Sequence, residues 1–130
     1  MAYVCCLAGI DRTEVPMFGS ALQMAGVSAI PIVARLEVTE LGRLAPNLLI
    51  CDVDDTTIDS LELLRQIRFV LPECLIAVYT GVMKSTWGLA CHLAGVNCVL
   101  SKDADERTLA HGVRNALHSG CYTDPRFAAA

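Results

Sequence analysis

Short apolar runs alternate with longer amphipathic segments along the whole chain. The apolar runs are bounded by polar and turn-forming residues, which is the pattern of strands buried on both faces of a sheet. Pro31 lies within the second run and lacks a backbone donor, so that strand is expected at an edge of the sheet. The predicted strands are residues 3–7, 29–34, 48–51, 74–79 and 97–100.

The segments between these runs repeat apolar residues at three- and four-residue intervals, which predicts helices. Residues suited to capping precede three of them, namely Thr13, Ser60 and Asp105. Arg65 and Arg68 fall on the polar face of the third helix and are expected in solvent. The predicted helices are residues 14–25, 37–44, 61–70 and 106–118, with a weaker one that begins at residue 85 and ends before the glycine at 95.

Five strand and helix pairs in strict alternation predict one architecture. Each parallel strand is reached through a right-handed helical crossover, so helices cover both faces of the sheet. We therefore predict a doubly wound α/β fold, (βα)5, with a parallel five-stranded sheet in the order 2-1-3-4-5. A chain of 130 residues is long enough for one such domain with its own hydrophobic core.

Composition and charge narrow the class of protein. Hydrophobic residues make up 54% of the chain, yet no apolar run approaches about 18 residues, so no membrane-spanning segment is expected. The first apolar run is not preceded by a basic leader, which argues against a signal peptide and for a cytoplasmic protein. A net charge of −4 argues against nucleic-acid binding by this domain.

The seven cysteines show no pattern typical of metal ligands. No CxxC pair occurs, and the three histidines are not spaced with cysteines as zinc ligands are. Six cysteines lie in apolar runs or on helical faces, where a free thiol packs as a small hydrophobic group. These six, predicted to be structural, are Cys5, Cys6, Cys51, Cys74, Cys91 and Cys98.

Three polar side chains follow the C-terminal ends of neighbouring strands in the predicted sheet. Asp52 follows the third strand, Thr80 the fourth and Lys102 the fifth. The carboxyl ends of parallel strands share one edge, so these side chains are expected to converge. An aspartate beside an ammonium and a hydroxyl is suited to forming an acyl phosphate, because these groups bind and neutralise phosphoryl oxygens.

The whole chain resembles the receiver domain of response regulators, and in particular the NarL/FixJ type. The resemblance lies in the separations of Asp52, Thr80 and Lys102 along the chain. It extends to DSLELLRQIR, residues 59–68, which is similar to the third helix of that family. It also includes AGVNCVLSKDADERTLAHGVRNALHSGCYTDPR, residues 94–126, which looks like the close of such a domain.

This resemblance implies a flavodoxin-like fold and a role in two-component signal transduction. Asp52 would accept a phosphoryl group from a histidine kinase, Thr80 would be the switch hydroxyl, and Lys102 would pair with the phosphate. Enzymatic activity would be limited to self-phosphorylation and self-dephosphorylation at Asp52. The expected partners are a histidine kinase or regulatory protein target and a second copy in a homodimer, with no membrane or nucleic acid. Residues 1–121 would form the receiver domain, and residues 122–130 a tail or the start of a linker.

The chain departs from the family at its magnesium site. Receivers end their first strand with adjacent acids that hold Mg²⁺. In this chain the corresponding residues are Gly9 and Ile10, or Ala8 and Gly9 in a register shifted by one, and Asp11 is the acid nearby. One interpretation is that Asp11, Asp52 and the backbone carbonyl of Asp54 still form a weakened Mg²⁺ site. The other, which we favour, is an atypical receiver with weak or absent phosphorylation that switches or docks without phosphoryl transfer.

A phosphatase is the alternative from another class. ICDVDDTTID also resembles the first motif of haloacid-dehalogenase-type phosphatases. That resemblance would make Asp52 the nucleophile and Asp54 the general acid and base, with Thr80 and Lys102 in the second and third motifs. Against it, the family usually carries the motif near the N-terminus and needs a further strand with acids after the lysine. Here Asp103 follows the lysine directly.

Overall fold

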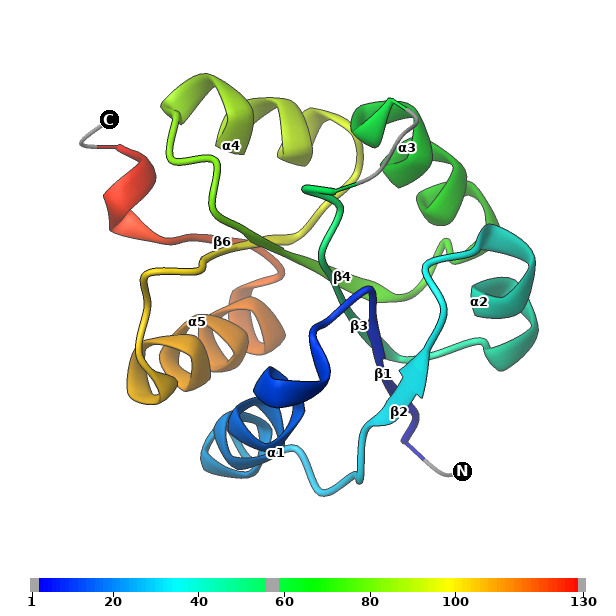
Figure 1. Cartoon of the computed structure of the whole chain (residues 1–130), viewed down its shortest axis with the longest axis horizontal. Coiled ribbons are helices and arrows are strands. Elements are labelled where there is room, and N and C mark those ends of the chain that lie inside the picture. The colour runs from blue at the N-terminus through cyan, green and yellow to red at the C-terminus, as the bar shows by residue number, and fades with distance from the viewer. Residues whose placement is uncertain (1–2, 56–58, 129–130) are drawn as a thin grey trace.

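A computed structural model describes residues 3–55 and 59–128 of the chain, and these fold around one parallel sheet (Figure 1). The strands are β1 (Cys5–Ala8), β2 (Ile32–Ala34), β3 (Leu48–Cys51), β4 (Leu75–Thr80), β5 (Cys98–Ser101) and β6 (Tyr122–Thr123). The helices are α1 (Val15–Met24), α2 (Val38–Leu44), α3 (Ser60–Val70), α4 (Ser85–Leu93) and α5 (Glu106–Ser119). Two short 3-10 helices, η1 (Arg12–Glu14) and η2 (Pro125–Phe127), complete the described chain.

The sheet has the strand order β2-β1-β3-β4-β5-β6, and all of its pairings are parallel. The predicted doubly wound fold and the order of its first five strands are confirmed. β2 lies at an edge, as the proline in that segment indicated, and its strand residues are exposed or half-buried. β6 was not predicted, because two residues give no periodic signal.

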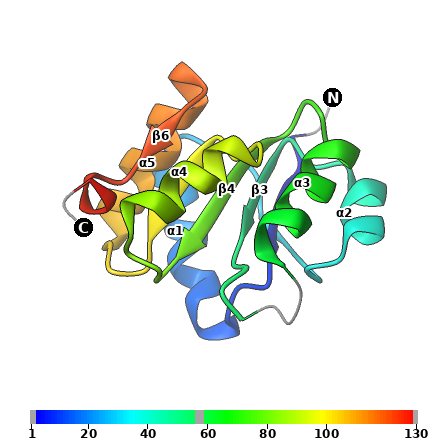
Figure 2. The same ribbon diagram turned by 90° about the horizontal axis from the view of Figure 1, so that it is seen from above.

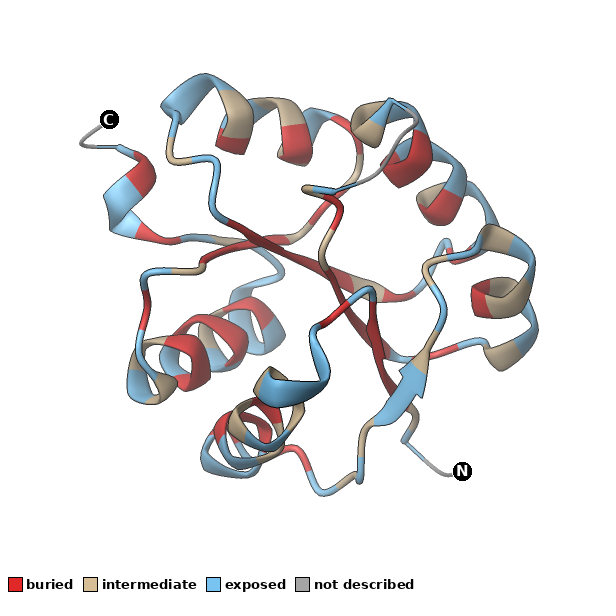
Figure 3. Cartoon of the chain, in the orientation of Figure 1, coloured by how far each residue is buried: buried red, intermediate tan, exposed pale blue. Residues whose placement is uncertain are grey.

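Helices cover both faces of the sheet and divide the core into two clusters. Figure 1 shows α1 and α5 on one face and α2, α3 and α4 on the other, and Figure 2 shows the row formed by α2, α3 and α4. Successive strand residues point to opposite faces, so Cys5 and Leu7 pack with α1 and α5 while Cys6 and Ala8 pack with the other three helices. The central strands are therefore buried throughout, as Figure 3 shows.

Two of the three predicted helix caps differ from those observed. η1 precedes α1, and its N-cap is Asp11, whose carboxylate accepts the backbone N–H of Thr13. The cap of α3 is Asp59 in place of Ser60, whose hydroxyl donates to the carbonyl of Val53. Several polar residues precede each helix, and local sequence does not decide which of them faces the free N–H groups. The third predicted cap, that of α5, is confirmed.

The predicted tail packs against the domain. β6 adds to the sheet beside β5, and Phe127 of η2 is only 1% exposed. The Phe127 ring lies against Gly88 of α4, where a Cβ would be 3.6 Å from the ring atom Cδ1. β6 and η2 therefore pack on the sheet and on α4, and the expected boundary at residue 121 stays a prediction. One aromatic residue among polar and small ones was too weak a signal to predict this.

The six cysteines predicted to pack as small hydrophobic groups are buried in the structure. Six of the seven cysteines are free and buried, and Cys121 is free and exposed. Burial raises the pKa of the Cys5 thiol to about 12, which keeps it protonated near neutral pH.

Within residues 3–55 and 59–128, none of the helices is long and apolar enough to cross a bilayer.

Arg68 of α3 is not in solvent as expected but ties three segments together. Its guanidinium Nη1 donates to the carbonyls of Leu71 and Cys74 at 2.9 and 2.8 Å. Nη2 donates to the carbonyl of Gly95 at 2.8 Å and to Asn97 Oδ1 at 2.6 Å. Partial burial lowers the pKa of this arginine without neutralising it. Arg68 thus joins the end of α3 to the loops that lead into β4 and β5.

We expect Arg68→Ala to lower the free energy of unfolding by about 2–4 kcal/mol, because partly buried carbonyls lose a charged donor. Arg65→Ala is the matched control, since Arg65 is exposed and pairs with Glu62 on its own helix, at 3.3 Å. Its expected effect is within about 0.5 kcal/mol. Urea denaturation of both variants measures the difference, and equal losses would contradict a structural role for Arg68.

Candidate functional site

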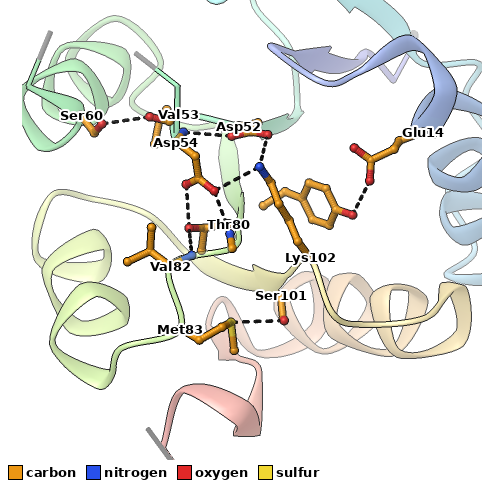
Figure 4. Close-up of polar contacts among 12 residues, drawn as sticks. Glu14, Asp52, Val53, Asp54, Ser60, Thr80, Val82, Met83, Ser101 and Lys102 are labelled. Atoms are coloured by element: carbon orange, nitrogen blue, oxygen red, sulfur yellow. Dashed lines mark hydrogen bonds and ion pairs between the residues drawn. The ribbon is translucent and has the colours of Figure 1, made fainter. Parts of the chain in front are cut away.

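The three predicted strand-end side chains lie together at the C-terminal edge of the sheet. Lys102 Nζ is 2.7 Å from Asp52 Oδ2, and the side chain of Thr80 lies beside this pair (Figure 4). The side chain of Asp52 is 12% exposed and that of Lys102 29%, while Thr80 is fully buried. The predicted convergence is confirmed, whereas the roles assigned to the three residues stay predictions.

The sheet itself fixes these positions, because its hydrogen bonds continue one residue beyond the strands. The N–H of Asp52 donates to the carbonyl of Ala8 at 3.0 Å, and the N–H of Lys102 donates to that of Thr80 at 2.9 Å. Thr80 is itself paired with Ser101, the residue before Lys102. All three backbones are thus set by buried strands rather than by mobile loop residues.

Asp54 is the member of the site whose role sequence reasoning missed. The receiver interpretation uses its backbone carbonyl as a metal ligand, and the phosphatase alternative uses its carboxylate as a general acid and base. In the structure the carboxylate instead accepts hydrogen bonds inside the pocket. Thr80 Oγ1 donates to Asp54 Oδ1 at 2.7 Å, and the N–H of Gly81 donates to Oδ2, also at 2.7 Å. Lys102 Nζ lies 3.1 Å from the same Oδ2. The acid was visible two residues after Asp52, but only the loop conformation shows where it points.

The two carboxylates share one ammonium group. Burial alone would raise the pKa of Asp54, but the donors Gly81, Thr80 and Lys102 outweigh it, and the pKa lies below its usual value. Burial likewise favours neutral Lys102, but its contacts with Asp52 and Asp54 outweigh this, and the pKa of the lysine is raised. Asp54 and Lys102 are therefore both charged at neutral pH.

The hydroxyl of Thr80 links the pocket to α4. Besides donating to Asp54, it accepts the N–H of Val82 at 3.0 Å and the indole N–H of Trp87 at 3.1 Å. Trp87 lies in the first turns of α4 and packs against the core that α2, α3 and α4 cover. A change in the hydrogen bonding of Thr80 would therefore alter the contacts of Trp87 at the start of α4.

The three residues after β1 make contacts within the fold and within a local turn. The φ angle of Gly9 is +71°, and a Cβ there would lie 2.7 Å from the carbonyl oxygen of Asp52. Ile10 is 7% exposed and packs in the core with α1 and α5. The Asp11 carboxylate is engaged with the N–H and hydroxyl of Thr13, at 2.9 and 2.8 Å.

The expected Mg²⁺ ligands, namely Asp11, Asp52 and the backbone carbonyl of Asp54, stay a prediction. In the described part of the chain, no group of three or more His, Cys, Asp or Glu side chains is placed to hold a metal ion. The side chain of Asp11 serves its own turn, and that of Asp54 faces three donors. Mg²⁺ prefers several oxygen ligands in a nearly octahedral arrangement.

Comparison with known proteins identifies the fold. No protein-family model and no curated protein matches the chain. Among solved structures, a LuxR-family two-component response regulator from Aurantimonas sp. matches with a TM-score of 0.72 and 18% identity, over 99% of this chain and 94% of its own. The isolated REC domain of RcsB from Salmonella enterica serovar Typhimurium, studied with the phosphomimetic BeF3⁻, gives 0.75 and 16%, over 99% and 98%.

A response regulator from Thermotoga maritima matches with a TM-score of 0.71 and 20% identity, over 91% of this chain and 100% of that one. These three matches span 91–99% of this chain, but their identities are low. They show that the chain has the fold of response-regulator receiver domains, the NarL/FixJ resemblance being consistent with the LuxR-family match. They show the fold alone.

We expect Gly9→Ala to lower the free energy of unfolding by about 1–3 kcal/mol, because an L side chain is strained at this φ and would collide with the carbonyl of Asp52. Gly19→Ala is the matched control, since nothing lies within 4 Å of its added Cβ inside α1. That change should raise stability by about 0.5–1 kcal/mol. Urea titrations compare the two, and a harmless Gly9→Ala would contradict the close approach.

The lowered pKa of Asp54 predicts a pH dependence of stability. A carboxyl group with a pKa depressed by folding contributes fully above its unfolded value, about pH 4, and loses that contribution as pH falls through its folded value. The stability that wild type gains over Asp54→Asn from this charged carboxylate should therefore shrink progressively as the pH falls below about 4. Asp55→Asn, at an exposed neighbouring position, should follow the wild-type curve more closely. Parallel curves for wild type and Asp54→Asn would contradict the charged contacts.

Proposed function

We propose that this chain, which has the fold of response-regulator receiver domains, is an atypical receiver in two-component signalling. It acts by binding other proteins, with weak or absent phosphorylation of Asp52. The observation that carries the proposal is the group of Asp52, Thr80 and Lys102 at the edge of the sheet, with the Asp52 and Lys102 side chains 2.7 Å apart. A doubly wound fold alone would support many functions, so the site bears the argument.

The proposed weakness of phosphorylation rests on the missing metal ligands. Phosphoryl transfer to a carboxylate needs the charge of the transferred group to be neutralised, and Mg²⁺ commonly supplies much of that neutralisation. Lys102 provides one positive charge and already contacts two carboxylates. Gly9 and Ile10 offer no side-chain oxygen where receivers carry acids. Asp52 therefore lacks the electrostatic help that the reaction requires.

Protein surfaces are the proposed partners, namely a histidine kinase, a regulatory target or a second copy of the domain. α4 is the element best placed to present the state of the pocket, because Trp87 contacts Thr80 while Leu89 and Leu93 are 61% and 80% exposed. Exposed apolar side chains of this size are typical of protein contacts. The net charge of −4 favours protein partners over nucleic acid.

The phosphatase alternative is not favoured by the geometry. A general acid must give up a proton, but Asp54 accepts from Thr80 and Gly81 and pairs with Lys102, which keeps it ionised. Asp105, one of the acids after the lysine, caps α5 by accepting the N–H of Thr108. These contacts use the two acids in structural roles.

A phosphodonor experiment tests the proposed function. We expect incubation with acetyl phosphate and Mg²⁺ to leave the intact mass of the protein nearly unchanged, because the metal shell at Asp52 is incomplete. Asp52→Asn, treated in parallel, defines the background. A Mg²⁺-dependent adduct that is clear in the wild type and lost in Asp52→Asn would overturn weak phosphorylation.

Two further measurements on the same samples separate the functional classes. Light scattering should give the same molecular mass with and without phosphodonor, because a domain that is not phosphorylated has no reason to change its assembly. Hydrolysis of p-nitrophenyl phosphate should remain at background. Turnover that disappears in Asp54→Asn would favour a phosphatase over a receiver.

A further inference from the structure

We infer that the carboxylate of Asp54 is a built-in ligand of the anion-binding pocket beside Asp52, occupying the donors that a phosphoryl group or another small oxyanion would use. The inference rests on the proposed function for its signalling meaning, because the domain would hold an anion-filled pocket without being phosphorylated. It adds an occupant and a ligand class to that site: small oxyanions, which the pocket should accept once its own carboxylate is removed.

Three donors of different kinds converge on the Asp54 carboxylate. Its Oδ1 accepts the hydroxyl of Thr80, and its Oδ2 accepts the N–H of Gly81 and contacts the ammonium of Lys102. The donor-to-acceptor distances are 2.7, 2.7 and 3.1 Å. A hydroxyl, a backbone N–H and an ammonium group together form a general oxyanion-binding set, and none of them is specific for a carboxylate.

The resident carboxylate lies directly beside the proposed phosphoacceptor. Asp52 and Asp54 each place their Oδ2 against the same Lys102 ammonium, and the other oxygen of Asp52 accepts the N–H of Asp54 at 2.9 Å. Both side chains also lie beside Gly81, where a Cβ would be in ordinary contact at 3.4 Å from Lys102 Cδ and 3.7 Å from Asp54 Oδ2. A group added to Asp52 would therefore compete with Asp54 for these donors.

Charge balance favours this arrangement over a second anion. Two carboxylates and one ammonium give the pocket a net charge of −1, so a further anion would be repelled. Removing the Asp54 carboxylate would leave a neutral pocket with a fully buried Thr80 hydroxyl deprived of its acceptor. Donors left unpaired in a buried site are costly, and a monovalent oxyanion would satisfy them and restore the original charge.

The Asp54 carboxylate and the fluorescent side chain of Trp87 share a hydrogen-bond partner, the Thr80 hydroxyl. Trp87 is the one tryptophan of the chain, and its indole N–H donates to the same Thr80 hydroxyl that donates to Asp54. In Figure 4, the Asp54 carboxylate lies between Thr80 and Lys102, and the backbone N–H of Val82 is directed at the Thr80 hydroxyl. Emptying or refilling the pocket should therefore alter the fluorescence of Trp87.

The test is chemical rescue of Asp54→Ala by formate, which supplies the carboxylate that the substitution removes. We expect Trp87 fluorescence of this variant to respond saturably to sodium formate, with an apparent Kd of about 1 mM or weaker, as befits so small a ligand. Its melting temperature should rise with formate more than with sodium chloride at equal ionic strength. Inorganic phosphate is the second probe and should compete with formate. Wild type should show no saturable response to either.

Matched variants separate a filled pocket from a general charge effect. Asp55→Ala removes an equal charge from the same loop at an exposed position and should behave as wild type. Asp54→Asn keeps the pocket filled by a side chain of similar size and should show little response to formate. Adding Thr80→Val to Asp54→Ala removes a donor and should weaken formate binding at least tenfold. Should Asp54→Ala not fold, Asp54→Ser empties part of the same space and is titrated instead.

Absence of a saturable formate response in both Asp54→Ala and Asp54→Ser would overturn the inference. An equal response in wild type, or one unaffected by Thr80→Val, would also overturn it, because the anion would then bind elsewhere. These outcomes are distinct from failure of the proposed function. A Mg²⁺-dependent phosphoryl adduct on wild-type Asp52 would overturn weak phosphorylation, whereas rescue by formate requires neither metal nor phosphodonor.

Discussion

The ammonium group of Lys102 is the interaction on which the site depends. It lies 2.7 Å from one carboxylate and 3.1 Å from another, in a pocket where both acids are mostly shielded from water. Without it, Asp52 and Asp54 would face each other as like charges in a medium that screens them poorly. The fold supplies this ammonium by ending β5 beside β4, so the sheet order is also the means by which the acids are neutralised.

Much of the fold could be predicted from the sequence because its signals are local and repeated. Buried parallel strands give continuous apolar runs such as 48–51, and each crossover helix gives an apolar stripe, so alternation alone determined the architecture. The convergence of Asp52, Thr80 and Lys102 followed from topology. What failed were features set by single contacts: the docking of Phe127, the bonds of Arg68 and the choice between Ser60 and Asp59 as a cap.

In the site as well, positions that follow from the sheet could be predicted, whereas a position that depends on individual contacts could not. A residue placed by a strand end could be predicted, since its position follows from the register of the sheet. Asp54 is placed by a loop, and the direction of its side chain depends on which donors the neighbouring strands present. Its sequence position therefore suggested a metal ligand, whereas its surroundings make it an acceptor for Thr80 and Gly81.

The close approach of Gly9 to the carbonyl of Asp52, just after β3, limits which substitutions the chain can accept at the end of β1. An acid introduced at position 9 would have to adopt an unfavourable backbone conformation and push away the carbonyl of Asp52 before it could offer an oxygen to a metal. An acid at position 10 would have to abandon a buried place among α1 and α5. Gaining an acidic side chain for a metal at either position by one substitution is thus opposed by the packing of the chain, and several coordinated changes would be needed together.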